Sequence, residues 1–400
     1  MKPILTLSWV LLALLPIVTN AEAWIAWQRV GDRIPAPIGG KTGDPERGRA
    51  LVVDRHKGNC LACHALPIPD QPFQGDIGPP LHGVGLRLTP AQLRLRVADE
   101  KQLNPETIMP GYYRDPRRFR MVDYRHEGQT ILDAQEIEDI VAFLSTLKTP
   151  LDPEAARHLA TPVSLPRDRP VSGYALLNES TREMQDDEFA NPGMAEVDRG
   201  RRLFHQIGNN GKSCATCHGE DGAKLNARAI AAFPKWNAEF EEPFTLQKQI
   251  NLCWEDQLDN VPWVYDCTEL VALEAFVRYK ARGEPIAVDV SGPMKPHYEA
   301  GRELYFMRFG QMDMSCHLCH DVYAGHHLRG QVLGQGHVNG FPEYRLGSGR
   351  MTSLHRRMTE CFVSFRAEPF DKGSDEFIDL EIYLHARSNG LPIETPAVRY

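Results

Sequence analysis

Three segments of the chain carry apolar residues at the spacing of an amphipathic helix. Each segment opens at a glutamate, and apolar side chains follow four, seven and eight positions later. The segments contain Glu136, Ile140, Phe143 and Leu144; Glu269, Leu273, Phe276 and Val277; and Glu376, Leu380, Tyr383 and Leu384. Residues at this spacing share one face of a helix. We therefore expect three helices, each burying one apolar face in a core.

A second helix-like segment lies ahead of each of these three. Residues 46–51, 198–203 and 299–304 each begin with an acidic residue, have a central Gly-Arg pair and end in leucine. A pair of helices that recurs three times indicates an internal repeat. We expect three small units, in each of which the last helix packs on the first.

The repeat sets the boundaries of these units. We place a first unit at residues 24–149, a second at residues 196–286 and a third at residues 287–400. Residues 150–195 are rich in Pro, Arg and Asp, so we expect them to connect the first unit to the other two.

The first 23 residues have the order of a secretory signal. Lys2 precedes an apolar run at residues 4–18, and small residues surround Ala23. A membrane anchor is the alternative, but Pro16 interrupts the run, which is shorter than the roughly 20 residues that a membrane span needs. We expect cleavage after Ala23 and export, most simply to a bacterial periplasm, without stable membrane insertion.

Composition narrows the class of protein. Apolar residues make up 42% of the chain and charged residues 24%, which is typical of a folded globular protein. The formal net charge of −8 and the lack of a basic amphipathic stripe argue against a nucleic-acid partner.

A C-x-x-C-H motif lies between the two helical segments of every unit. The copies are Cys60, Cys63 and His64; Cys214, Cys217 and His218; and Cys316, Cys319 and His320. Two thiols at this spacing form thioethers to haem vinyl groups, and the adjacent histidine becomes an axial iron ligand. A thioredoxin-like dithiol, a zinc site and a disulfide are the alternatives, and a redox dithiol would not need the histidine. Three copies in an exported chain predict three covalently attached haem c groups in a mainly α protein of three tandem class I cytochrome c-like domains.

The sixth iron ligand differs between units. In the first unit Met109 follows His64 by 45 residues and precedes Pro-Gly, a position typical of a distal methionine in small c-type cytochromes. Met121 is the competing ligand. A thioether ligand raises the reduction potential, so this unit is suited to electron relay.

The second unit has neither Met nor His between Gly219 and Asp266, which leaves Cys253 or Cys267 as a soft ligand. Cys253 precedes its helix landmark Glu269 by 16 residues, and Cys361 precedes Glu376 by 15. The two cysteines are therefore equivalent in the repeat. Cys267 adjoins the last helix, where a buried thiol or disulfide is commoner than a ligand.

The third unit leaves more choices open, because Met351, His355 and Met358 lie in the same predicted loop as Cys361. Cations surround this sulfur, and Glu360 is the one acidic residue among them. The cations are Arg345, Arg350, His355, Arg356, Arg357 and Arg366. Such a field favours a thiolate and attracts an anionic substrate, although some of these arginines are expected to pair with haem propionates.

Longer stretches resemble a known family. GNCLACHALP, Met109-Pro110-Gly111-Tyr112 and ILDAQEIEDIVAFL resemble SoxX, the monohaem subunit of the sulfur-oxidising cytochrome. From about Ser172 onward, STREMQDDEFANPG, INLC, GQMDMSCHLCH, QGHVNGFPEYR and RMTECFVSFRAEPF resemble SoxA. SoxX and SoxA are usually separate chains, so this chain looks like a fusion. A tether of this kind raises the effective concentration of one part near the other.

The resemblance implies an L-cysteine S-thiosulfotransferase that oxidatively couples thiosulfate to a cysteine of the carrier SoxY. Electrons would leave through the SoxX-like haem to a small soluble cytochrome c. The implied axial pairs are His64/Met109, His218/Cys253 and His320/Cys361. In the family the third haem is the active site, its cysteine ligand can be persulfidated, and an arginine equivalent to Arg357 lies near the substrate. A plain electron carrier and a thiosulfate dehydrogenase forming tetrathionate are the alternatives.

Overall fold

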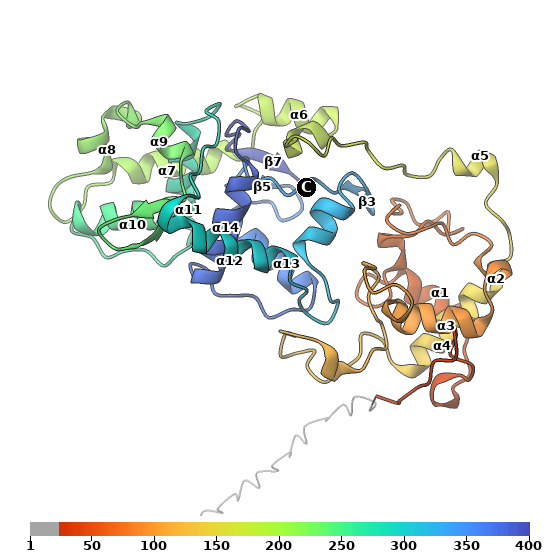
Figure 1. The fold of residues 1–400 in the computed structure, drawn as a ribbon. Coiled ribbons are helices and arrows are strands. Elements are labelled where there is room, and N and C mark those ends of the chain that lie inside the picture. Colours follow the sequence, from red (N-terminus) through yellow and green to blue (C-terminus); the bar gives the residue numbers. More distant parts are fainter. Residues whose placement is uncertain (1–23) are drawn as a thin grey trace, which may run out of the picture.

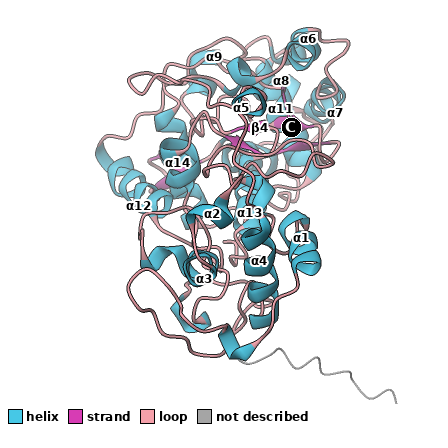
Figure 2. Cartoon of the chain, turned by 90° about the vertical axis from the view of Figure 1, so that its right-hand side faces the viewer, coloured by secondary structure: helices cyan, strands magenta, loops and turns pink. Residues whose placement is uncertain are grey.

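The computed structural model describes residues 24–400, so the predicted signal segment at residues 1–23 lies outside the described residues. Helices and loops make up most of the described chain, and the strands are few and short (Figure 2). The predicted mainly α character is confirmed. Within residues 24–400, every helix falls short of the length and apolar character that crossing a bilayer requires.

Each of the three residue ranges proposed as units contains helices. The first unit contains α1 (Pro45–Val53), α2 (Val84–Arg87), α3 (Pro90–Asp99) and α4 (Ala134–Thr146). The connector contains α5 (Pro153–Ala156) and α6 (Glu179–Asp186), and α7 (Met194–His205) begins at its end. The second unit continues with α8 (Cys214–His218), α9 (Ala227–Ala231), α10 (Leu246–Asp256) and α11 (Thr268–Tyr279). The third unit contains α12 (Lys295–Phe306), α13 (Leu354–Ser364) and α14 (Asp375–Arg387).

Three small antiparallel or mixed sheets accompany these helices. Strands β1 (Lys235–Asn237) and β2 (Glu242–Phe244) pair in the second unit, and β3 (His327–Leu328) pairs with β4 (Gln331–Val332) in the third. The third sheet has the order β6-β5-β7, formed by β5 (Glu343–Arg345), β6 (Arg350–Thr352) and β7 (Ala397–Arg399). Because β7 runs parallel to β5, the C-terminal residues return to the middle of the third unit.

The predicted pairing of first and last helices is confirmed. Helix α1 packs on α4, α7 on α11 and α12 on α14. Each pair crosses at the glycine of the Gly-Arg pair. A Cβ on Gly48, Gly200 or Gly301 would lie 2.0, 2.0 or 1.9 Å from a carbonyl oxygen of the partner helix, so only glycine allows the backbones this close.

Side-chain caps fix where the three last helices begin. Asp133 caps α4 in a capping box with Glu136, and Ser374 caps α14. Cys267 takes the same place at the start of α11, where its Sγ accepts a hydrogen bond from the backbone N–H of Leu270 at 3.4 Å. This cysteine therefore has a structural role as a helix cap.

The third unit lies between the other two (Figure 1). Each unit has its own apolar core, although Met351 and Ile393 of the third unit also pack in the core of the second. The connector runs back across the third unit. The backbone N–H of Val163 donates to the carbonyl of Gly325 at 2.8 Å, and Gln335 bonds both Pro166 O (2.6 Å) and Val171 N (2.7 Å).

Candidate active site

The third unit encloses a cavity of about 510 Å³ that brings the predicted axial residues together. His320 and Cys361 both line it, together with Cys316 of the third C-x-x-C-H motif. Burial raises the pKa of the Cys316 thiol to about 12, and the nearby Cys361 is the next largest cause. Cys316 and Cys361 both line this cavity, as a haem-attaching cysteine and an iron ligand of one haem would.

The ring of His320 is held by a hydrogen bond to the backbone. His320 lies in the π-helical turn Leu318–Val322, and its Nδ1 is 2.8 Å from the carbonyl oxygen of Gly334. This bond leaves Nε2 free to bind a metal. A Cβ on Gly336 would come within 3.0 Å of the ring, so a glycine is needed beside it. The cavity and these contacts fit a covalently attached haem c.

Cys361 and Arg357 occupy one face of α13. They are four residues apart, and residues at that spacing are neighbours on a helix. Helix α13 begins at Ser353, whose side chain accepts from the N–H of Arg356, and it buries Leu354, Met358 and Phe362. This stretch was predicted as a loop, and that prediction is wrong because these apolar residues recur at helical spacing.

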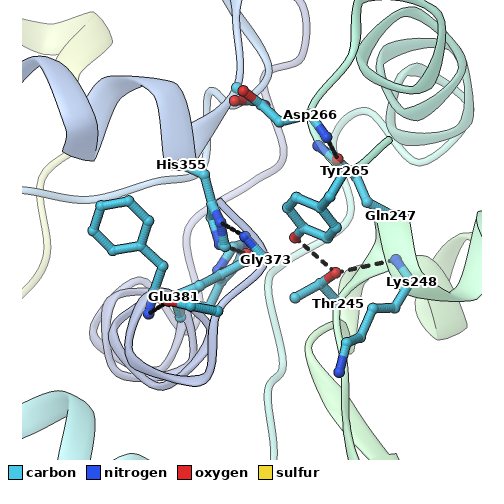
Figure 3. Close-up of polar contacts among 12 residues, drawn as sticks. Thr245, Gln247, Lys248, Tyr265, Asp266, His355, Gly373 and Glu381 are labelled. Carbon is cyan, nitrogen blue, oxygen red and sulfur yellow. Dashed lines mark hydrogen bonds and ion pairs between the residues drawn. The ribbon is translucent and has the colours of Figure 1, made fainter. Parts of the chain in front are cut away.

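Two of the rival ligands are engaged elsewhere. Met351 lies in β6 and packs in the core of the second unit. Both ring nitrogens of His355 are bonded, Nε2 to Glu381 at 2.9 Å and Nδ1 to the N–H of Gly373 at 3.0 Å (Figure 3). Met358 does line the cavity beside Cys361 and remains the nearest competitor.

The cations near Cys361 have different roles. Arg345 and Arg357 line the cavity, and the charge of Cys361 is the main cause that raises the pKa of Arg357. Arg350 is exposed and pairs with Glu360 at 3.7 Å. Arg366 reaches the first unit, donating to the carbonyl of His56 at 3.0 Å. Arg356 faces the buried Asp266 at 3.6 Å.

Several lining residues come from distant parts of the chain. Arg399 and Tyr400 reach the cavity through β7, and Glu343 reaches it through β5. Arg399 is held by Gln185 and by Glu394, the latter at 2.6 Å. Connector residues Val171, Gly173, Leu176, Leu177 and Asn178 form another part of the wall. The sequence pattern contains no signal for these residues, since long-range folding brings them to the site.

In the second unit the structure brings Cys253 near Cys214, the first cysteine of the C-x-x-C-H motif. Cys253 lies on α10, and Gln249 donates to its Sγ at 3.5 Å. Burial, followed by the nearby Cys253, raises the pKa of the Cys214 thiol to about 11. His218 ends α8, and its ring lies 6.2 Å from that of Phe204. Cys217 is exposed.

The first unit repeats the histidine geometry of the third. Nδ1 of His64 is 2.8 Å from the carbonyl oxygen of Pro79, and a Cβ on Gly78 would come within 2.2 Å of the ring. Met109 packs partly buried against the core of this unit. Met121 is 38% exposed, and its carbonyl accepts from the N–H of Glu368 in the third unit. This arrangement favours Met109 over Met121 as a ligand.

The first and third motifs meet across the interface between their units. One apolar cluster contains Ile77, Ile108 and Leu318, with Cys63 and Cys319 packed against it. Burial, then Cys361, then Cys63 raise the pKa of the Cys319 thiol to about 12. The thioether positions of the two predicted haems are therefore close together.

Comparison with known proteins agrees with this geometry. Residues 45–148 match the cytochrome c family, and residues 199–286 match the cytochrome c domain of the SoxA/TsdA family. The L-cysteine S-thiosulfotransferase subunit SoxA of Pseudaminobacter salicylatoxidans is 39% identical over 242 residues, which are 60% of this chain and 84% of that protein. The chain belongs to the SoxA family.

Other SoxA proteins give the same result. SoxA of Rhodovulum sulfidophilum is 37% identical over 57% of this chain and 79% of its own length. The crystal structure of SoxXA from P. pantotrophus matches with 34% identity and a TM-score of 0.55, covering 58% of this chain and 87% of the matched chain. The predicted enzyme class is confirmed, because the curated SoxA relatives are L-cysteine S-thiosulfotransferase subunits.

Proposed function

We propose that this chain is a fused SoxX–SoxA enzyme that couples thiosulfate oxidatively to a cysteine thiol of the carrier SoxY. The observation that carries the proposal is the cavity of the third unit, which His320, Cys361 and Arg357 line together. A histidine and a cysteine at one haem-sized cavity, with a guanidinium beside the sulfur, suit a site that binds a sulfur dianion next to a thiolate.

The proposal assigns one haem c to each of three cytochrome c-like domains, at residues 24–149, 196–286 and 287–400. The residues that would bind the three irons are His64 and Met109, His218 and Cys253, and His320 and Cys361. The recurring helix pairs and the matched histidine hydrogen bonds in the first and third units support this assignment. Residues 150–195 form the connector, and export to the periplasm follows from the predicted signal at residues 1–23.

In the proposed reaction one sulfur–sulfur bond forms, between the terminal sulfur of thiosulfate and the carrier thiol. The thiol proton goes to solvent and two electrons leave, so the product is a cysteine S-thiosulfonate. Bound haem c supplies one-electron acceptor chemistry, and a small soluble cytochrome c is the final oxidant. The electrons leave through the SoxX-like first unit, and the apolar cluster against which both Cys63 and Cys319 pack supports that exit.

The residues of the chain have three tasks in this reaction. Arg357 and Arg345 bind the dianion, since both line the cavity and guanidinium groups bind oxyanions through paired hydrogen bonds. Cys361 holds or exchanges sulfur as a thiolate or persulfide. The apolar wall of Leu354, Phe362 and Leu384 limits water around the reacting sulfurs.

Replacing the central sulfur tests the proposal. In a Cys361→Ala variant we expect all three haems to remain attached, because attachment uses the motif cysteines, and coupling of thiosulfate to the carrier to be abolished. Haem content is measured by intact mass, and coupling by the mass gain of the carrier peptide. Full turnover in this variant would remove Cys361 from the mechanism.

A thiosulfate dehydrogenase forming tetrathionate is the second candidate, because the matched domain family includes TsdA as well as SoxA. Both reactions need a cationic, cysteine-containing haem site. Product analysis with and without the carrier separates them. Tetrathionate formed at the same rate without the carrier would favour the dehydrogenase.

A further inference from the structure

The loop that carries Met109, residues 106–114, lies between two units. On one side Met109 packs against the core of the first unit. On the other side the buried Ile108 packs with Leu318 of the third unit. The loop that holds the proposed sixth ligand of the first haem is therefore built partly by the third unit.

The carbonyl of Thr107, two residues before Met109, receives hydrogen bonds from both units. Lys101 Nζ of the first unit lies 3.0 Å from it, and Arg308 Nη1 of the third unit lies 3.2 Å from it. Thr107 also contacts the ligand residue, because its Oγ1 accepts from the N–H of Met109 at 3.1 Å. Thr107 is buried, so these bonds are shielded from water.

Asp313 of the third unit holds the cations in place. One of its carboxylate oxygens lies 3.0 Å from Arg114 Nη1, 3.5 Å from Lys101 Nζ and 3.8 Å from Arg308 Nη1. Arg308 also donates to the carbonyl of Asp313 at 3.4 Å. Asp313 thus holds the guanidinium of Arg308 within the third unit, in a position from which it also bonds to Thr107 of the first unit.

A thioether is a weak, neutral ligand, so its place at the iron depends on the loop that presents it. We infer that Arg308 is a positioning residue for Met109, which holds residues 106–114 where the methionine sulfur can bind the first haem. The inference rests on the proposed His64/Met109 pair. It makes the ligation of the SoxX-like unit depend on its contact with the SoxA-like third unit, which couples the two halves of the chain.

The test compares variants of the full holoprotein in the ferric state. Arg308→Ala should weaken the charge-transfer band that a methionine sulfur gives ferric haem, and should bind imidazole at the first haem about tenfold more tightly, since a hydrogen bond from a charged donor is lost. Arg308→Lys should show a band intensity and an imidazole affinity between those of Arg308→Ala and the wild type. The matched control is Arg302→Ala on α12, an exposed arginine that pairs with Glu299 of the same helix.

Met109→Leu separates the two ways in which this can fail. If the wild type lacks the methionine band, or Met109→Leu retains it, the ligand assignment is wrong and the inference falls with it. If Met109→Leu abolishes the band while Arg308→Ala leaves both the band and the imidazole affinity unchanged, the inference alone is overturned. Should Arg308→Ala fail to give holoprotein, Arg308→Gln takes its place, since glutamine keeps an N–H donor without the charge. We expect this variant, too, to weaken the methionine band and to bind imidazole more tightly.

Discussion

A single sulfur and its surroundings distinguish the third unit from the second. Both units place a cysteine near the first thiol of a C-x-x-C-H motif. Around Cys361 lie the guanidinium groups of Arg357 and Arg345, whereas Cys253 has the amide of Gln249, and the acidic Glu255 and Asp256 follow it on the same helix. This difference supports the proposal that thiosulfate reacts at Cys361, because acidic neighbours such as those of Cys253 would repel a dianion.

Arg357 is the proposed binding residue for thiosulfate. Arg357→Ala should raise the KM for thiosulfate about tenfold, because a charge-assisted hydrogen bond to the dianion is lost, and Arg357→Lys should recover part of it. Steady-state kinetics with the carrier measures this effect. Arg350→Ala is the control, since Arg350 is exposed and pairs with Glu360 outside the cavity. Equal effects of the two alanine variants would contradict the assignment.

Pairs of helices are the recurring element. Three times the chain closes a small core by packing a first helix against a last helix, and each time a glycine lets the backbones touch. Asp133, Cys267 and Ser374 cap the last helices, so each of the three helix pairs also has a side-chain cap at the same place.

Gly301 lies where α12 and α14 cross, and a larger residue there should destabilise the third unit. Gly301→Ala should lower the free energy of unfolding by about 1–3 kcal/mol, since the added methyl would sit 1.9 Å from the carbonyl oxygen of Asp379 and force α12 away from α14. Thermal unfolding of the holoprotein measures the change. Gly347→Ala is the matched control, because a Cβ there meets nothing within 4 Å. A Gly301→Ala variant as stable as this control would contradict the packing.

The elements also show what the sequence could predict. The helix pairs were predictable because their signals are local: apolar residues recur at helical spacing, and capping residues precede the last helices. Helix α13 was predicted as a loop, because the charged residues between Leu354, Met358 and Phe362 obscure the helical spacing of these apolar residues. The β6-β5-β7 sheet was not foreseen, because strands of three residues have no readable period and β7 joins β5 from far along the chain. Arg399 was missed for that reason.

Within residues 24–400 the three proposed units lie in a row, with the proposed reaction site in the middle one (Figure 1). The first unit is joined to the third by more than the connector. His327 lies 3.0 Å from Asp76, Arg114 pairs with Asp313, and Arg366 donates to the carbonyl of His56. The connector itself lines the walls of two cavities around His320. Residues 163–178 therefore belong to the site and not to a free linker.

The contacts between the first and third units should hold them together after the connector is cut. A specific protease site inserted between Leu159 and Ala160, ahead of the segment fixed by Gly325 and Gln335, should be cleaved readily. The two fragments should still elute together in size-exclusion chromatography at physiological salt, because the ion pairs and apolar contacts between the first and third units remain. Separation of the fragments would show that only the covalent tether holds the units together.

The electron paramagnetic resonance spectrum of the ferric holoprotein tests whether Cys361 binds the iron of the third unit, since it distinguishes thiolate-ligated from histidine/methionine-ligated haem. We expect low-spin signals of two thiolate-ligated haems in the wild type. One of these signals should disappear in Cys361→Ala and the other in Cys253→Ala. A spectrum that Cys361→Ala leaves unchanged would contradict the placement of this sulfur opposite His320, and the proposed site with it.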